Sequence, residues 1–267
     1  MKKIIITFIA AMCSLFATAR NYHEILINAG GGLSTFNNDL SSGKPGCDFG
    51  IGYSCIFSRS VGIHVGAEIA LYNSSVNLSG VKIVTRNLVD SEGDVFNMHT
   101  TLNKYQESHN DLFLNIPIMA KFQPYRLRNF FAMGGLKIGI PLSCNYQASN
   151  FTLINEAYYP DYNNWLTNQE FAGFGRFENI NSKGEQNYNI SIAFAFETGM
   201  SWELRYIALY AGLYFDYGLN NIASKSAPFV KYTNSEPAEF KTNRALISST
   251  DINLMTIGVK VRVALIK

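Results

Sequence analysis

The sequence contains no apolar stretch that could cross a membrane as a helix, and it is poor in charge, cysteine and proline. The apolar run near the N-terminus, Ile4 to Ala11, falls well short of the roughly 20 residues that a transmembrane helix needs. Charged residues make up only 16% of the 267 residues, and 22 basic residues are nearly balanced by 20 acidic ones, which leaves no basic field for nucleic acid. Four cysteines and seven prolines provide neither a zinc or redox motif nor a proline-rich linker. These absences argue against a helical membrane protein, a nucleic-acid-binding protein and a chain of separate domains.

The N-terminus has the three parts of a secretory signal peptide. A basic start at Lys2 and Lys3 precedes the short apolar run, and Ala17-Thr18-Ala19 forms a small-residue cleavage site. We therefore expect residues 1–19 to be a signal peptide and residues 20–267 to form one exported domain. Removal of Lys2 and Lys3 leaves 20 basic against 20 acidic residues, so the exported chain is formally neutral.

Three cysteines remain after export, and an odd number in an oxidising compartment leaves at least one thiol unpaired. Cys55 falls on the apolar phase of its segment, beside Tyr53 and Phe57, as a small apolar side chain would. Cys47 and Cys144 are predicted near the same rim, which permits a disulfide between them without requiring one.

What the sequence does contain is a repeated alternation of side-chain type over strand-length segments. One segment has its apolar positions at Leu112, Leu114, Ile116, Ile118, Ala120 and Phe122. Another has them at Ile190, Ile192, Phe194 and Phe196, with small or polar residues such as Ser191 and Glu197 between them. Successive side chains of a strand point to opposite sides, so each segment has one apolar and one small or polar face. Because a soluble barrel keeps its apolar face inside, the apolar face here is predicted to point outward into lipid.

Eight segments carry this alternation, and we predict that each is one strand of a closed barrel. They are Glu24–Phe36, Cys47–Phe57, Val61–Val76, Asp111–Phe122, Asn129–Tyr146, Tyr188–Trp202, Tyr206–Tyr217 and Asp251–Leu265. Short turns follow the second, fourth and sixth segments, and long loops follow the first, third, fifth and seventh, which is typical of outer-membrane barrels with periplasmic turns and extracellular loops. The predicted fold class is therefore all-β, an eight-stranded antiparallel transmembrane up-and-down β-barrel.

Seven charged residues fall on the inward phase of these strands. They are Glu68, Lys121, Lys137, Glu197, Asp216, Lys260 and Arg262. The interior of an eight-stranded barrel is only wide enough for side chains, and an isolated buried ion costs several kcal/mol. We therefore expect a network of ion pairs that plugs the lumen, with Asp216 near Lys260 or Arg262 because the last two strands are neighbours.

Two segments carry a family resemblance. Leu112 to Phe122, with the sequence LFLNIPIMAKF, resembles the strand of type L-x-[IL]-P-[LI]-x-x-K-[YF] in PorT-like outer-membrane β-barrel proteins. Phe131 to Leu136 is similar to the next strand of that family, Y-x-x-x-G-x. The chain departs from the family at Asn115, where glutamate is common, and in its final residue, Lys267, which is not aromatic. The resemblance implies an outer-membrane barrel and, because some members are implicated in protein secretion, an accessory role in export.

Small barrels include some enzymes, so we searched the predicted rims for catalytic groups. Ser108, His109 and Asp111 lie close together in sequence, but on a strand Ser108 points away from the other two. We expect a solvated strand end and no catalytic residues. His64 is predicted to face the interior and His99 to lie in a loop, and neither has a partner at metal-ligand spacing. We expect no metal and no cofactor.

A loop rich in aromatic residues is the best candidate for contact with a partner. It contains Tyr158, Tyr159, Tyr162 and Trp165 together with asparagine and aspartate. Tyrosine and tryptophan supply amphipathic contact area and the polar residues supply hydrogen bonds, which suits a glycan or a protein surface. The alternative is that these rings pack the loop onto its own barrel.

These observations predict a non-enzymatic protein of the Gram-negative outer membrane. Its partners would be outer-membrane lipid and, through the long loops, envelope proteins or glycans, with no nucleic acid. Its function would be to present loops for interaction or to support export or assembly. The alternatives are a porin-like channel for small solutes and a lipid- or peptide-modifying enzyme.

Overall fold

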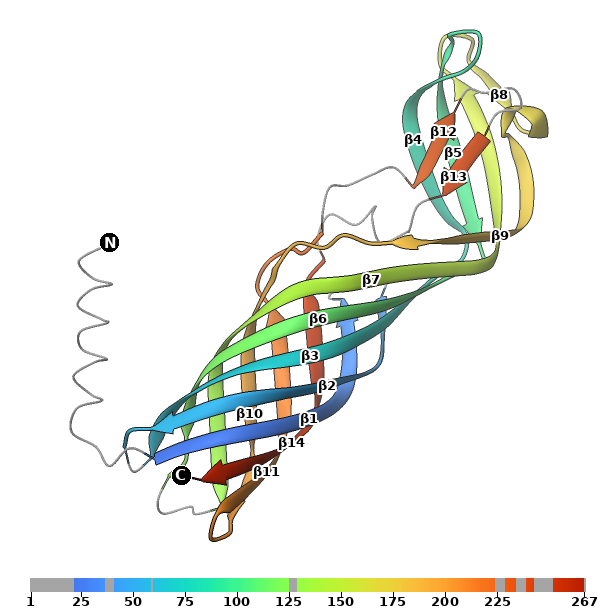
Figure 1. Cartoon of the computed structure of the whole chain (residues 1–267). Helices are drawn as coiled ribbons and strands as arrows, with labels where there is room; N and C mark the ends of the chain where they lie inside the picture. The colour runs from blue at the N-terminus through green and yellow to red at the C-terminus, as the bar shows by residue number, and fades with distance from the viewer. Residues whose placement is uncertain are drawn as a thin grey trace, which may run out of the picture.

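The computed structural model describes residues 22–36, 41–58, 60–124, 129–223, 229–233, 239–242 and 252–266. The predicted signal peptide, residues 1–19, lies outside this described part. The fold is built almost wholly from antiparallel β-strands (Figure 1). Among the described residues, no helix has the length and apolar character needed to cross a membrane.

Eight strands form a closed ring of hydrogen-bonded neighbours. In ring order they are β1 (Tyr22–Phe36), β2 (Ser41–Ile56), β3 (Val61–Leu78), β6 (Tyr105–Phe122), β7 (Phe130–Tyr159), β10 (Ser191–Glu203), β11 (Ile207–Gly218) and β14 (Leu254–Ile266). Pairing of β14 with β1, from Glu24 opposite Ile266 to Phe36 opposite Leu254, closes the ring. The predicted fold class is confirmed, and each of the eight predicted segments overlaps one barrel strand.

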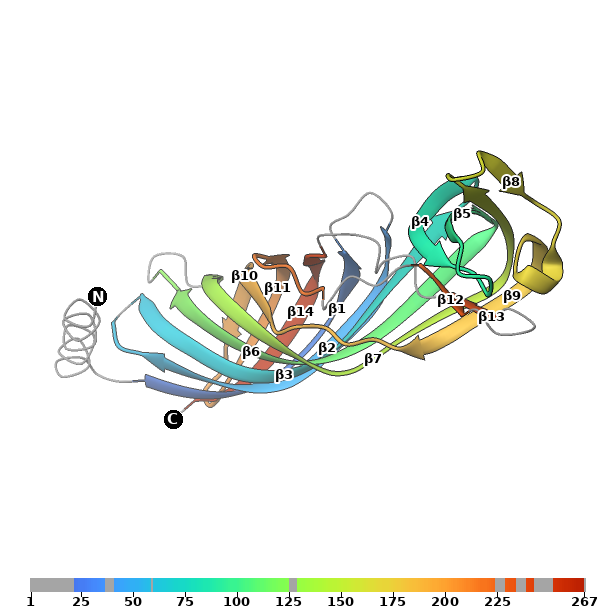
Figure 2. The same cartoon turned by 90° about the horizontal axis from the view of Figure 1, so that it is seen from above.

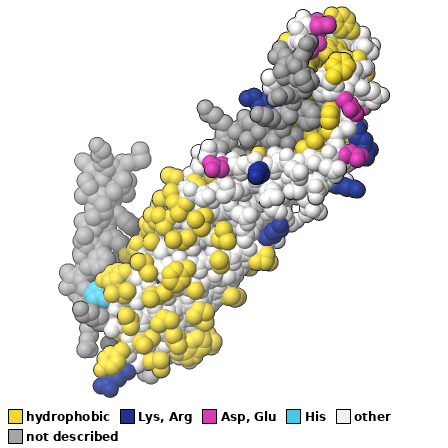
Figure 3. Space-filling model, turned by 45° about the vertical axis from the view of Figure 1, so that its right-hand side comes forward, with side chains coloured by type: hydrophobic (Ala, Val, Ile, Leu, Met, Phe, Trp, Pro, Cys, Tyr) yellow, Lys and Arg dark blue, Asp and Glu magenta, His cyan; other side chains and the backbone are white. Residues whose placement is uncertain are grey.

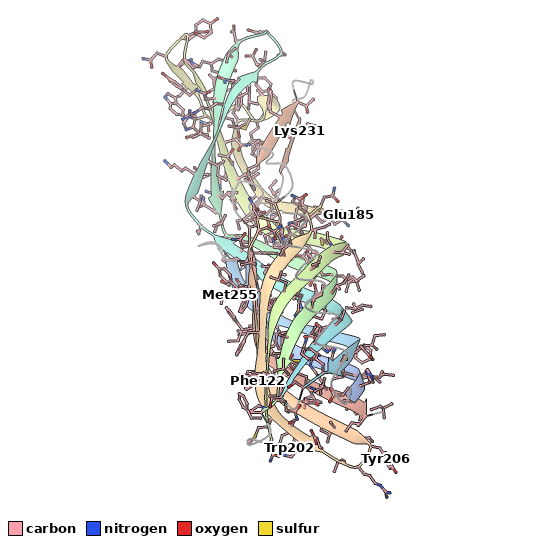
Figure 4. The ribbon with its side chains drawn as sticks, turned by 90° about the vertical axis from the view of Figure 1, so that its left-hand side faces the viewer. Phe122, Glu185, Trp202, Tyr206, Lys231 and Met255 are labelled. Atoms are coloured by element: carbon pink, nitrogen blue, oxygen red, sulfur yellow. The ribbon has the colours of Figure 1, made fainter. Side chains whose placement is uncertain are left out.

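The two ends of the barrel differ in their connections. Short turns join β2 to β3, β6 to β7 and β10 to β11 at one end. The first strand begins and the last strand ends at this same end, because Glu24 pairs with Ile266. Trp202 and Tyr206, which flank the β10–β11 turn, lie here (Figure 4). Every long connection therefore emerges at the opposite end.

The outer surface of the barrel is apolar, and the inner surface is polar. On β10, Phe194 and Phe196 are exposed on the outside, whereas Glu197 is buried inside. The same alternation holds along β6, where Ile118 is exposed and Lys121 is buried. Figure 3 shows the resulting belt of hydrophobic side chains on the face of the barrel in view, with the few visible charges on this face lying outside the belt.

The long connections are not irregular loops, because they form a second β-structure beyond the barrel, here called the extension. Its elements are β4 (Val81–Val89), β5 (Val95–Asn103), β8 (Asn164–Leu166), the 3-10 turn η1 (Glu170–Ala172), β9 (Gly175–Glu185), β12 (Val230–Thr233) and β13 (Glu239–Thr242). The 30-residue strand β7 runs from the barrel into the extension, where it pairs with β5 on one edge and β9 on the other. Figures 1 and 2 show β7 joining the two parts and the extension projecting past the barrel.

One hydrophobic core fills the extension and continues into the adjoining end of the barrel. In the extension, Phe96, Leu102 and Phe151 are completely buried. In the barrel, Phe36 and Phe113 belong to the same cluster. The extension is therefore packed continuously onto the mouth of the barrel, at the end that carries the long connections.

Candidate functional site

The structure places all seven predicted interior charges inside the barrel, each at most 6% exposed. Glu24, Asp48 and His64 join them, so that five carboxylates face four lysine or arginine cations and one histidine. The contacts fall into three groups along the barrel axis, described in turn from the short-turn end.

The first group is a triangle of Glu24, Lys121 and Tyr210. The Lys121 Nζ lies 2.6 Å from Glu24 Oε2 and donates to the Tyr210 hydroxyl at 2.8 Å. The Tyr210 hydroxyl in turn donates to Glu24 Oε1 at 2.6 Å. These residues come from β1, β6 and β11, so the triangle spans the lumen near its short-turn end.

The second group is centred on Arg262 of β14. Its Nε donates to Glu197 Oε1 at 2.9 Å, and its Nη2 contacts Glu197 Oε2, which makes the pair bidentate. Its Nη1 lies 3.0 Å from His64 Nε2. Because arginine has no acceptor, His64 Nε2 accepts this bond, and the proton of a neutral imidazole is then on Nδ1, which lies 3.0 Å from Ser54 Oγ.

Gly52 provides the space for that imidazole. A Cβ built on Gly52 would lie 2.5 Å from His64 Cε1, closer than real Cβ contacts allow. The two residues are on neighbouring strands, since β2 pairs with β3 through Gly52 opposite Gly66 and Ser54 opposite His64. The absence of a side chain at Gly52 is thus part of the packing around Arg262.

The third group connects Asp48, Glu68 and Lys260, with Lys137 and Asp216 beside them. Lys260 Nζ lies 2.8 Å from Asp48 Oδ1 and 2.9 Å from Glu68 Oε1. Lys137 Nζ lies 2.5 Å from Asp216 Oδ2 and 3.6 Å from Glu68 Oε2. Glu68 therefore lies between the two lysines.

The predicted partner of Asp216 is wrong. On β14 the residue opposite Asp216 is Thr256, and Lys260 is opposite Gly212 instead. Asp216 and Lys260 thus lie at different depths although their strands are neighbours. Lys137, which is two strands away on β7, reaches Asp216 across the interior.

Aromatic rings cross the lumen between the charged groups and the extension. Tyr188 contacts Phe36 and Phe113, with ring centroids 5.7 Å and 6.2 Å apart. Tyr72 packs edge-on against Phe113 at 5.5 Å, and its hydroxyl accepts a hydrogen bond from Asn115 at 2.6 Å. Two cavities beside Glu68 each have a volume of about 10 Å³, room for about one water molecule. The described part of the lumen is thus filled by side chains.

The sequence-adjacent Ser108, His109 and Asp111 do not form a catalytic arrangement. The predicted solvated strand end is wrong, because His109 and Asp111 are each only 1% exposed on the inward side of β6. Ser108 lies on the other side of the strand and accepts a hydrogen bond from Lys44 Nζ at 3.1 Å. His109 Nε2 lies 2.5 Å from Glu107 Oε1. Within the described residues, no cluster of three or more His, Cys, Asp or Glu side chains could hold a metal ion.

Cys47, Cys55 and Cys144 are free thiols. Cys47 is exposed on the outside of the wall and Cys144 is buried inside. The disulfide that the sequence permitted between Cys47 and Cys144 is therefore not formed.

The four predicted contact aromatics lie at the tip of the extension, and the structure divides them into two pairs. Tyr158 and Trp165 are cross-strand neighbours with ring centroids 4.9 Å apart. Trp165 also packs against His99 at 4.8 Å, and His99 lies on strand β5 and not in the predicted loop. Tyr159 and Tyr162 instead line a recess of about 680 Å³. Trp165 and Tyr162 are the exposed members, at 47% and 64%.

The recess lies between the β4–β5 turn, the β7–β8 turn and η1, with β12 beside it. Residues outside the predicted contact loop complete it, and the sequence reasoning did not single them out. They are Asp90, Ser91, Glu92, Asp94, Asn164, Leu166, Gln169, Phe171, Ala172, Phe174 and Tyr232. The sequence contains no local signal for this recess, because its walls come from three separate parts of the chain, around Asp90, Tyr162 and Tyr232.

The carboxylates of the recess are bonded to its tyrosines. The Tyr159 hydroxyl donates to Asp90 Oδ2 at 3.0 Å, and the Tyr162 hydroxyl donates to Asp94 Oδ1 at 3.2 Å. Burial, followed by the hydrogen bond to Asp90, raises the pKa of Tyr159 above its ordinary value. The hydrogen bond to Asp94 and the charge of that carboxylate raise the pKa of Tyr162. Both phenols are therefore neutral at physiological pH.

Comparison with known proteins gives structural similarity only. No family model matches the chain, and no curated protein matches it, so membership of the PorT-like family stays a prediction. The chain is similar to two small outer-membrane β-barrels, each at 10% sequence identity and a TM-score of 0.32. One is Ail, the attachment invasion locus protein of Yersinia pestis, crystallised with the heparin analogue sucrose octasulfate, with 90% of this chain and 98% of that chain covered.

The other is neisserial surface protein A, NspA, with 90% of this chain and 96% of that chain covered. The translocator domain of the autotransporter NalP from Neisseria meningitidis is also similar, at 9% identity and a TM-score of 0.21, with 96% and 92% covered. At these levels the assignment of the fold rests on the strand pairing of the chain itself, which is that of a closed eight-stranded antiparallel β-barrel.

Proposed function

We propose that this protein is an integral β-barrel of the Gram-negative outer membrane that holds a folded extension outside the cell as an interaction surface and catalyses no reaction. The observation that carries this proposal is the combination of a filled barrel with a projecting extension. A barrel whose lumen is occupied by its own ion pairs serves as an anchor, and the exposed surface for recognition is then on the extension.

The two faces of the barrel wall support the proposed membrane location. Side chains such as Ile51, Leu213 and Val259 are each about 60% exposed on the outside, where water would have to cover them in a soluble protein. The charges of the same strands lie inside, as in transmembrane barrels. The predicted signal peptide and the closed ring without a free edge suit export and insertion into the outer membrane.

The proposed partners differ between the two surfaces of the protein. Outer-membrane lipid surrounds the belt, and envelope proteins or glycans are the partners that an extracellular surface meets. An accessory role in protein export or assembly rests on the resemblance of Leu112–Phe122 and Phe131–Leu136 to PorT-like strands.

A solute channel is the second candidate function, because a closed transmembrane barrel is the fold of porins. The interior argues against it. Ion pairs such as Arg262 with Glu197 and the tilted rings around Tyr188 lie where a pore would run. An enzyme is the third candidate, and the divergent directions of Ser108 and His109 argue against that particular catalytic grouping.

Topology labelling tests the proposal. Cysteine is introduced at Asp161, an exposed residue of the β7–β8 turn, or at Ser58, an exposed residue of the β2–β3 turn, after Cys47, Cys55 and Cys144 are replaced by serine. An impermeant maleimide should label Asp161→Cys on intact cells and Ser58→Cys only after the outer membrane is permeabilised. The reverse pattern would place the extension in the periplasm and overturn the proposal.

A further inference from the structure

The recess at the tip of the extension is lined by aromatic rings, and the hydrophobic core leaves two of them, Phe171 and Tyr162, uncovered. Phe171 is 74% exposed on η1, an element without buried residues, although phenylalanine is among the residues most often buried. Tyr162, in the β7–β8 turn, lines the same recess and is 64% exposed. Phe174 and Tyr232 stack nearly parallel, 9° apart, and complete the aromatic lining.

The electrostatics of the recess are negative. Asp90, Glu92 and Asp94 come from the β4–β5 turn, and among the described residues that line the recess none is a lysine or an arginine. The turn is rigid, because Asp90 Oδ1 accepts the backbone N–H groups of Glu92 and Asp94, both at 2.9 Å. Figure 3 shows acidic and hydrophobic side chains close together at this tip.

The negative charge of the recess also raises the pKa values of two of its tyrosines, Tyr232 and Tyr162. The pKa of Tyr232 is raised first by burial and then by the charge of Asp90. The pKa of Tyr162 is raised first by its hydrogen bond to Asp94 and then by the charge of that carboxylate. Both phenols are therefore neutral at neutral pH, and their electron-rich ring faces are available to a cation.

We propose that the recess binds an alkylammonium group, supplied either by a small amine or by a lysine side chain. Aromatic ring faces attract cations through the ring quadrupole, and nearby carboxylates add a direct electrostatic attraction. A sulfated or phosphorylated ligand would instead be repelled by three carboxylates. This inference rests on the proposed function and deepens it, because it names the ligand class for the extension.

Calorimetric titration of the full-length barrel in detergent tests the inference. The probes are tetraethylammonium, for a small amine, and a deca-lysine peptide, for lysine side chains, with maltohexaose as a neutral sugar. We expect saturable binding of at least one cationic probe that weakens as the salt concentration rises, and no binding of the sugar. Binding of tetraethylammonium alone would identify a small-amine site, and binding of the peptide alone would identify a lysine-side-chain site.

Two variants locate the binding. Glu92→Gln combined with Asp94→Asn removes two charges without changing side-chain size, and Phe171→Ala removes an exposed ring that stabilises no core. Each should weaken binding by at least about fivefold. The matched control is Glu178→Gln, which removes an exposed carboxylate elsewhere on the extension, where it pairs with Arg176. It should leave binding within about twofold.

The inference is overturned if neither cation binds, if maltohexaose binds in their place, or if Glu178→Gln weakens binding as much as the recess variants. If the wild-type protein binds neither cation but Asp161→Cys is still labelled on intact cells, the ligand class is rejected and the proposed function stands. A reversed labelling pattern would reject the proposed function whatever the titration shows.

Discussion

Arg262 and Glu197 face each other across the barrel interior from strands that are not neighbours, because β11 lies between β14 and β10. Both side chains are at most 2% exposed, and the pair is bidentate. A buried pair of this kind differs from a surface salt bridge in one respect. Removal of one partner leaves the other charge without compensation in a site that water reaches poorly.

Arg262→Ala or Glu197→Ala should therefore lower the free energy of unfolding by about 3–5 kcal/mol. The double variant Arg262→Met with Glu197→Gln keeps the volume and removes both charges, so it should cost less than either single variant. Urea titration of the barrel in lipid vesicles measures all three. A double variant that is less stable than both single variants would contradict this view of the pair.

Gly52→Ala should be destabilising although it adds only one methyl group. The new Cβ would lie 2.5 Å from the His64 ring, which is held by Ser54 and Arg262 and has little freedom to move. We expect a loss of about 1–3 kcal/mol in the free energy of unfolding, the usual effect of overpacking. Gly134→Ala is the control, because its nearest neighbour, Phe196 Cδ2, would lie at 3.8 Å. Equal unfolding free energies for the two variants would show that His64 is not held in place.

The lipid face can be tested with two residues of equal exposure. Phe194 on the barrel is 44% exposed and Val84 on the extension is 43% exposed. Phe194→Arg puts a charge into hydrocarbon and should cost about 2–4 kcal/mol if it lies near the midplane, whereas Val84→Arg meets water and should cost less than about 1 kcal/mol. Folding titrations into vesicles compare the two. Similar costs would mean that the barrel surface is not in lipid.

The extension should lose stability at high pH through Tyr159. Its pKa is raised in the folded protein by burial and by the hydrogen bond to Asp90, so the unfolded chain ionises first as the pH rises. The stabilising contribution of Tyr159 is then complete below about pH 10, the unfolded value, and is lost as the pH rises above it. Thermal unfolding followed by circular dichroism should decline less steeply above about pH 10 in Tyr159→Phe than in the wild type. Parallel declines would show that Tyr159 does not contribute.

The eight barrel strands were predictable because lipid outside and a narrow interior impose opposite demands on alternate residues. On β10, exposed Phe194 and Phe196 alternate with buried Ala195 and Glu197, a pattern that no soluble sheet requires. The extension was harder to predict because that contrast ends where the membrane ends. On β7 beyond the barrel, the inward series of Phe151, Leu153 and Ala157 is interrupted by Asn155.

Asn155 shows why the interruption is compatible with a strand. It is completely buried, its side-chain oxygen accepts a hydrogen bond from Thr100, and its amide donates to the carbonyl of Gly173. Those partners lie on β5 and just after η1. The hydrogen bonds that satisfy the buried amide of Asn155 are therefore tertiary contacts, which the local sequence does not show. From the sequence alone, a segment with a polar residue at an inward position is predicted as a loop, because the hydrogen-bond partners of that residue are not known.

The interior network was predictable in its membership and not in its pairing. Alternation identifies which residues face inward, but it does not show how far each strand is shifted along the barrel axis. That shift puts Asp216 opposite Thr256 and within reach of Lys137. Asp48 was overlooked although it shares the inward phase of Gly50 and Ser54 on β2. Glu24 was overlooked at the first position of its predicted strand.

Planar-bilayer recording of the purified wild-type protein tests the central claim most directly, namely that the barrel is a sealed anchor for its extension. Ion pairs around Glu68 and Arg262 and the rings around Tyr188 fill the described lumen. The account predicts insertion of the protein without steady conductance at any applied voltage that the bilayer tolerates. Steady ohmic conductance in proportion to the amount of inserted protein would contradict it, and the channel would then be the leading function.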